Sequence, residues 1–216
     1  MYSCILFAGK VEKGVRLGDV FENMQAFVGE DEVMKMNAEL AERRDFTVED
    51  IENLPESVRA ELIDGQIFFH AAPKLIHQDL AGKLYRKLWD YVDENDGKCR
   101  VYFAPVAVKL VEDGRNYLEP DLIVVCDEEK LDEDGCHGAP DLVIEIISKS
   151  TQKRDYGIKM LKYRTAGVKE YWIVDPIKET VMVYWFEDEK QNCLYGLNEE
   201  IEFHLFPGLK VKLKED

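Results

Sequence analysis

A run near the middle of the chain, "PDLVIEIIS" at 140–148, limits the folds open to this sequence more than any other segment. Leu142 to Ile147 are nearly all aliphatic, which is typical of a strand buried on both faces of a sheet. Glu145 interrupts the run, and a buried carboxylate is costly unless a partner or a metal ion compensates it. The segment therefore predicts a central strand of an α/β sheet, with a glutamate that needs an explanation.

The flanking segments alternate between helix and strand patterns. A hairpin is predicted at "RAELIDGQIFF" (59–69), because Asp-Gly separates two apolar runs. Residues 74–94 predict a long amphipathic helix with apolar residues at fourfold spacing, and 151–166 predict a second helix closed by Gly167. Strands are predicted within 99–111, 117–126, 140–148, 170–175, 180–186 and 208–213. We expect one α/β domain over 46–216, a central mixed sheet flanked by these helices, after an N-terminal extension of unclear role at 1–45.

Charge and cysteine content narrow the class of protein. A net charge of −16 argues against tight, non-specific binding to nucleic acid over the whole surface, although residues 149–169 are strongly basic. The five cysteines are odd in number and scattered, with no CxxC pair, so neither a disulfide framework nor a zinc knuckle is predicted. No run is long and apolar enough for a signal-peptide core or a membrane span. A soluble, cytoplasmic protein without membrane contact is expected.

Acidic residues open two of the predicted strands. Asp141 and Glu145 share one face of their strand because side chains alternate, and Glu119 and Asp121 open the preceding strand. If the two strands are neighbours, these carboxylates converge at one end of the sheet and repel one another unless a cation neutralises them. Such oxygen-rich clusters suit Mg²⁺ or Mn²⁺. In the alternative, both aspartates cap the turns after their prolines and Glu145 pairs with a lysine.

Four segments occur together at a specific joint spacing: "RAELIDGQIF", "IHQDLAGKLYRKL", "YLEPDLIVV", and "GAPDLVIEIISKST" followed by "KRDYGIKMLKYRTAGVKEYWIVDP". This set resembles the Uma family of putative restriction endonucleases, a branch of the PD-(D/E)xK nuclease superfamily, over roughly residues 46–190. The resemblance implies a restriction-endonuclease-like fold and Mg²⁺- or Mn²⁺-dependent hydrolysis of phosphodiester bonds, with DNA as the substrate. Restriction-type nucleases are often dimers, so it also implies a homodimer.

The resemblance assigns the main site residues position by position. Asp121 and Glu145 match the two metal-binding acids, and Glu61 matches an early glutamate of the family. The superfamily lysine falls at Ile147, so this chain departs from the simple pattern. Within the family the role of that lysine is thought to move to the following helix, where Lys159 matches.

Further positions are secondary candidates. Asp141 belongs to the second "PD", His77 matches a histidine at the start of the long helix, and Lys149 is a second candidate for the cation. The basic helix is expected to contact nucleic-acid phosphate through Lys153, Arg154 and Lys162.

Other interpretations stay open. The missing lysine at Ile147 agrees with a non-catalytic descendant that keeps the fold as a binding or assembly module. Lys159 also has a purely structural partner available in Asp155, four residues earlier. An acidic protein that binds a basic partner through 127–134 leaves the buried glutamate unexplained. Geometry separates the first two interpretations, because an enzyme requires Asp121, Glu145 and Lys159 to converge.

Overall fold

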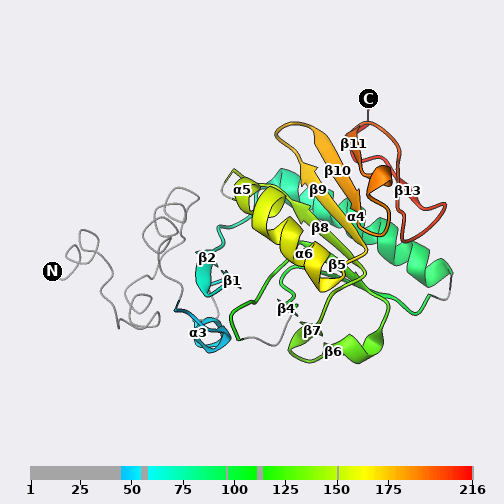
Figure 1. The fold of residues 1–216 in the computed structure, drawn as a ribbon. Helices are drawn as coiled ribbons and strands as arrows, with labels where there is room; N and C mark the ends of the chain where they lie inside the picture. The colour runs from blue at the N-terminus through cyan, green and yellow to red at the C-terminus, as the bar shows by residue number, and fades with distance from the viewer. Residues whose placement is uncertain (1–44, 55–57, 96, 111–113, 150, 216) are drawn as a thin grey trace. The chain divides into compact units, whose positions relative to one another are not determined.

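The computed structural model describes residues 45–54, 58–95, 97–110, 114–149 and 151–215 (Figure 1). These residues form two compact units. The first holds 45–54, 58–72 and 114–116, and the second holds 73–95, 97–110, 117–149 and 151–215. The expected extension at 1–45 lies almost wholly outside the described residues.

The first unit is built on the predicted hairpin. Strands β1 (Ala60–Ile63) and β2 (Gln66–Phe69) pair antiparallel, with a two-residue Asp-Gly turn between them. Both turn residues have positive φ, 51° and 75°, as the tightest hairpin turns require. The short helix α3 (Val48–Glu52) precedes the hairpin, and the N–H of Thr47 donates to the Asp50 carboxylate at its start (2.8 Å). The hairpin prediction is confirmed.

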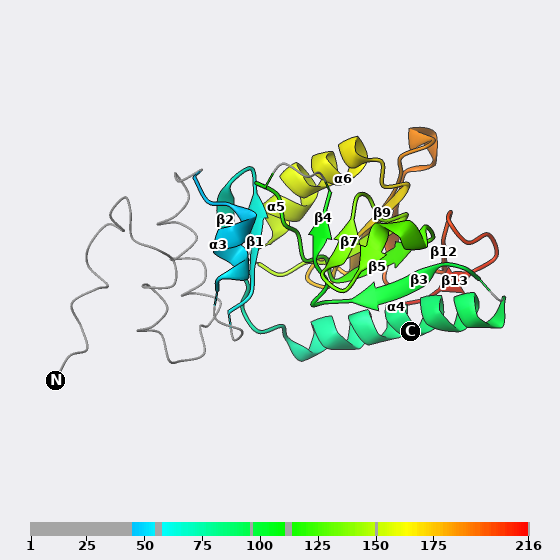
Figure 2. The same cartoon turned by 90° about the horizontal axis from the view of Figure 1, so that it is seen from below.

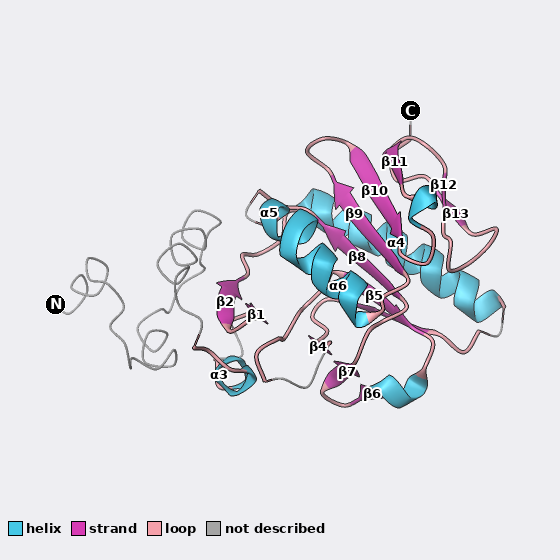
Figure 3. Ribbon diagram, viewed as in Figure 1, coloured by secondary structure: helices cyan, strands magenta, loops and turns pink. Residues whose placement is uncertain are grey.

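A six-stranded mixed sheet forms the centre of the second unit (Figure 3). Its order is β11–β10–β9–β8–β5–β3, in which only β8 and β9 are parallel neighbours. Parallel neighbours need a crossover, and the predicted second helix supplies it. The mixed α/β fold is confirmed. The bounds are β3 (Arg100–Phe103), β5 (Leu122–Val125), β8 (Leu142–Ile146), β9 (Glu170–Asp175), β10 (Thr180–Trp185) and β11 (Cys193–Gly196).

Helices cover both faces of this sheet (Figure 2). Helix α4 (Leu75–Glu94) lies on one face, close to its predicted bounds. The other face is covered by α5 (Gln152–Arg154), the π-helical turn η2 (Asp155–Lys159) and α6 (Met160–Ala166). Gly167 ends α6 in the left-handed region with φ 98°, as predicted. No helix in the described ranges is both long and apolar enough to span a bilayer.

Several short elements complete the second unit. The predicted strand at 208–213 contains β13, which pairs with β12, whereas β4, β7 and β6 form a separate three-stranded sheet. Strands of two or three residues are too short to show a periodicity in the sequence. The bounds are β4 (Val108–Lys109), η1 (Glu128–Lys130), β6 (Leu131–Asp132), β7 (Gly135–His137), η3 (Glu189–Gln191), β12 (Ile201–Glu202) and β13 (Lys210–Val211).

Alternation along β8 separates an apolar face from a functional one. Leu142, Ile144 and Ile146 belong to the large hydrophobic core that α4 and the C-terminal segment cover. Full burial of such a side chain stabilises the fold by about 1.5–3 kcal/mol. Glu145 points to the opposite face, where it meets side chains of η2 and α6. Burial of Ile144 and Ile146, the residues on either side of Glu145, therefore fixes the backbone that carries Glu145.

A disulfide joins Cys99 and Cys126, contrary to the expectation of no such bond. Arg100 lies opposite Val125, so one further step along the β3–β5 ladder sets the two cysteines opposite one another. The bond ties the edge strand β3 to β5. The two cysteines are 27 residues apart, and no local sequence pattern indicates that they lie opposite one another.

Candidate active site

The register of β5 against β8 brings Asp121 and Glu145 together. Leu122 lies opposite Ile144, so Asp121, immediately before Leu122, and Glu145, immediately after Ile144, lie at the same end of this antiparallel ladder. The Ile146 N–H donates to Asp121 Oδ2 (2.7 Å) and fixes this carboxylate beside the end of β8. The two acids singled out in the sequence thus lie at the same end of two neighbouring strands.

Glu145 is buried and compensated by two donors. Its side chain is only 5% exposed, and its Oε1 accepts from Lys159 Nζ (2.7 Å) and from the Tyr163 hydroxyl (2.8 Å). Hydrogen bonds between charged groups are the strong ones, and here both partners are withdrawn from water. The lysine explains how the central strand tolerates a carboxylate.

Lys159 reaches Glu145 from the helical layer rather than from the strand. Its side chain is 2% exposed, and its Nζ lies 2.7 Å from Glu145 Oε1 and 3.7 Å from Asp155 Oδ1. A π-helical turn brings residues four apart to nearly the same side, so Asp155 and Lys159 both face the sheet. Ile147, at the superfamily lysine position, is a buried apolar residue. The ammonium group near Glu145 therefore comes from η2 rather than from β8.

His77 also belongs to this group. Its Nε2 lies 3.1 Å from Asp121 Oδ1, and the two side chains are 17% and 18% exposed. The histidine comes from the first turns of α4, at the position that the resemblance indicated. Because Asp121 and His77 are more exposed than Glu145 and Lys159, the group is open to solvent on the Asp121 side.

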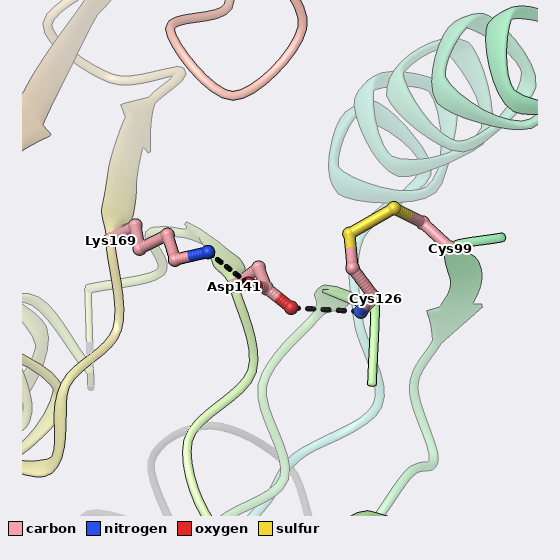
Figure 4. Close-up of a disulfide and its surroundings, with 4 residues drawn as sticks. All are labelled: Cys99, Cys126, Asp141 and Lys169. Atoms are coloured by element: carbon pink, nitrogen blue, oxygen red, sulfur yellow. Dashed lines mark hydrogen bonds and ion pairs between the residues drawn. A yellow bond between two sulfur atoms is a disulfide. The ribbon is translucent and has the colours of Figure 1, made fainter. Parts of the chain in front are cut away.

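Asp141 lies at the other end of the strands, so its expected convergence with Asp121 and Glu145 is wrong. Since β5 and β8 are antiparallel, the start of β8 meets the end of β5. Asp141 accepts from the Cys126 N–H (2.8 Å) and pairs with Lys169 (2.8 Å), next to the disulfide (Figure 4). The hydrogen bond to Asp141 raises the pKa of Lys169. Asp141 therefore anchors strand ends.

The other basic candidates differ in exposure. Lys149 is exposed. The ammonium group that contacts Glu145 is that of Lys159, so Lys149, the second candidate, is not the cation there. Lys153 is exposed and Lys162 is partly exposed, so both side chains face solvent as expected. Arg154 is only 8% exposed, which contradicts its predicted role as a surface contact to phosphate. Its position in the turn before η2 buries the residue.

Glu61 lies in the first unit. It occupies the buried strand β1, and its Oε2 is 3.5 Å from His70 Nε2. Like Glu145, it is a buried acid with a nearby nitrogen. Its part in the site stays a prediction.

The acids of the second unit fit a hard divalent cation. Mg²⁺ binds through one or two carboxylates and completes its shell with water and substrate phosphate, so Asp121 and Glu145 suffice as protein ligands. Within the part of the chain that the structure describes, no group of three or more His, Cys, Asp or Glu side chains is placed to hold a metal ion.

Sequence reasoning did not assign Tyr163 to the site. Asp155, Lys159 and Tyr163 are spaced at i, i+4 and i+8, and this spacing was the available signal. It places all three on one side of the helical layer. Tyr163 is fully buried, and its hydroxyl contacts Glu145.

Comparisons with known proteins identify the family and a similar fold. The model of the Uma2 family, described as "Putative restriction endonuclease", matches residues 48–214. The crystal structure of a putative nuclease belonging to DUF820 from Anabaena variabilis ATCC 29413 superposes with a TM-score of 0.60 at 21% identity. The match covers 74% of this chain and 90% of that one. An uncharacterized protein of Synechocystis sp. is 25% identical over 130 residues, which are 60% of this chain and 67% of its own length.

Proposed function

The chain belongs to the Uma2 family of putative restriction endonucleases, and on this basis we propose that it is a metal-dependent endonuclease that hydrolyses phosphodiester bonds in DNA. The observation that carries the proposal is that Asp121 and Glu145 lie at the same end of β5 and β8, with Lys159 at 2.7 Å from Glu145. A purely structural ion pair explains Lys159 and Glu145. It does not explain why a second, partly exposed carboxylate lies at the same end of the neighbouring strand.

Hydrolysis of a phosphodiester needs an activated water, in-line placement and neutralisation of charge on the phosphoryl oxygens. Asp121 and Glu145 are the residues that hold Mg²⁺ or Mn²⁺ in this proposal. When bound, such an ion lowers the pKa of a ligated water and offsets phosphate charge. The two carboxylates differ in exposure, so Asp121 faces the incoming substrate and Glu145 forms the inner wall of the site.

Lys159 supplies the positive charge inside the site. Its ammonium group carries three donors, one of which contacts Glu145 at 2.7 Å. The others can orient the attacking water or stabilise negative charge on the phosphate. Because Asp155 lies 3.7 Å away, the ammonium group stays near the sheet when its contact with Glu145 changes. His77 holds Asp121 from the α4 side.

The substrate assignment follows the local charge. DNA is repelled by a chain of net charge −16 except where basic side chains gather. Lys149, Lys153 and Lys162 provide such a segment beside η2. A homodimer is part of the proposal, since restriction-type nucleases that cut both strands are often dimers.

Plasmid nicking and cleavage with Mg²⁺ or Mn²⁺ tests the proposal, with a chelator control. We expect the wild-type protein to cleave the plasmid and Glu145→Gln to cleave it at least 100-fold more slowly. Glu170→Gln is the matched control, because Glu170 is another buried acid of the sheet, bound to Trp172 Nε1 (2.7 Å) and to backbone N–H groups on the α4 face. It should keep its cleavage rate.

Failure of wild-type protein to cleave any DNA or RNA substrate would remove the enzyme proposal. That result would favour the alternative of a nuclease-fold binding module. The Ile147 departure from the superfamily pattern is the observation on its side.

A further inference from the structure

The Tyr163 hydroxyl contacts the same oxygen of Glu145 as Lys159. Its distance to Oε1 is 2.8 Å, and the residue has no exposed surface. A carboxylate only accepts, so the hydroxyl donates this hydrogen bond. Because Tyr163 is fully buried behind Glu145, it acts through the carboxylate rather than on a substrate.

The two donors on Glu145 differ in stiffness. Lys159 is a flexible chain whose ammonium group lies between Glu145 and Asp155. Tyr163 is a rigid ring packed against the Tyr171 ring at 5.1 Å between centroids. The Tyr171 hydroxyl in turn donates to the backbone carbonyl of Asp155 (3.1 Å). Packing against the Tyr171 ring therefore holds the Tyr163 hydroxyl at a fixed place beside Glu145.

Orientation matters most for a long acidic side chain. Three rotatable bonds separate the Glu145 carboxylate from its backbone, so its contacts decide how it meets a cation. If phosphate or a metal ion entered, Lys159 would have to exchange partners, whereas the Tyr163 hydroxyl could stay in place. Groups that orient a metal ligand typically contribute 10–100-fold to metal affinity or activity.

We infer that Tyr163 is a positioning residue, which holds the Glu145 carboxylate in its metal-binding orientation through the hydrogen bond to Oε1. The inference rests on the proposed function, because it concerns the same metal-binding carboxylate. It adds a residue of α6 to a site otherwise made from β5, β8, η2 and the start of α4.

The experiment compares Tyr163→Phe with Tyr171→Phe. Each change removes one buried hydroxyl from the same ring pair. Tyr163→Phe removes a donor to Glu145, whereas Tyr171→Phe removes a donor to the backbone carbonyl of Asp155. Thermal midpoints, Mn²⁺ affinity by calorimetry, and the Mn²⁺ dependence of plasmid nicking are measured on the full chain. We expect similar midpoints, Mn²⁺ binding about 10-fold weaker in Tyr163→Phe, and wild-type affinity in Tyr171→Phe.

Excess metal separates positioning from folding. The nicking rate of Tyr163→Phe should rise toward the wild-type rate at saturating Mn²⁺, because mass action restores occupancy. A damaged fold would leave the rate low at every Mn²⁺ concentration, and that result overturns the inference.

The remaining outcomes separate the two claims. Equal Mn²⁺ affinity in wild type and Tyr163→Phe, with a cleaving wild type, overturns the inference alone. Equal weakening in both variants also overturns it, since general loosening of the ring pair then explains the effect. A wild type that neither binds Mn²⁺ nor cleaves overturns the proposed function and this inference together.

Discussion

Replacement of Lys159 by methionine tests whether this lysine compensates the buried acids. Methionine keeps most of the apolar stem and removes the ammonium group, so Glu145 and Asp155 stay buried without their cation. Removal of one partner from a buried ion pair typically costs about 3–5 kcal/mol. For a chain of this size, that loss lowers the thermal midpoint by roughly 6–20 °C.

Lys169→Met is the matched control for this change. Lys169 also contacts an aspartate at 2.8 Å, but its side chain is 44% exposed. A solvated pair of that kind contributes about 1 kcal/mol or less. Both substitutions replace lysine by methionine in contact with an acid, and the two sites differ most in the burial of the lysine.

Urea unfolding at neutral pH measures both variants and the double variant Lys159→Met/Glu145→Gln. Because glutamine removes one of the two negative charges that Lys159 compensates, the double variant should recover about 1–3 kcal/mol relative to Lys159→Met. A Lys159→Met protein no less stable than Lys169→Met would refute the reasoning. So would a double variant whose loss is the sum of the single losses.

Three further predictions follow from the structure. Changing Cys99 and Cys126 together to serine should lower the free energy of unfolding by about 3.5 kcal/mol in urea melts, given the loop of 27 residues that the bond closes; no change would mean that the bond is absent in solution. Burial raises the pKa of Glu170 above its usual 4.5, so its contribution to stability is greatest below pH 4.5 and falls as pH rises through the raised value. Glu170→Gln should flatten the dependence of the free energy of unfolding on pH over this range, as measured by urea melts at a series of pH values. An unchanged dependence would contradict the raised pKa of Glu170. His77→Ala should reduce cleavage about 10-fold and leave the fold intact by circular dichroism, because the histidine orients Asp121 from a partly exposed position; an unchanged rate would make it a surface residue only.

Local signals predicted the parts of the fold that depend on neighbours in sequence. The Asp-Gly hairpin, the leucine spacing of α4 and the Gly167 cap follow from short-range conformational preferences, and the structure confirms them. The crossover between β8 and β9 follows from the helix between them. The antiparallel pairing of β5 with β8 depends on contacts across the sheet, which a single sequence does not encode locally.

The same division applies to the site. Asp121, Glu145 and Lys159 could be chosen because their segments carry strong patterns and a family resemblance. Asp141 was misplaced because its position depends on the direction of β5 relative to β8. Tyr163 was missed because its role depends on which side of the helical layer faces the sheet.

Calorimetric titration of Mn²⁺ into wild type, Asp121→Asn and Glu145→Gln tests the central claim most directly. We predict one Mn²⁺ site per chain in wild type, and affinity at least 10-fold weaker in each variant, because the two carboxylates bind the ion jointly. Absence of Mn²⁺ binding in wild type, or equal affinity in all three proteins, would contradict the account.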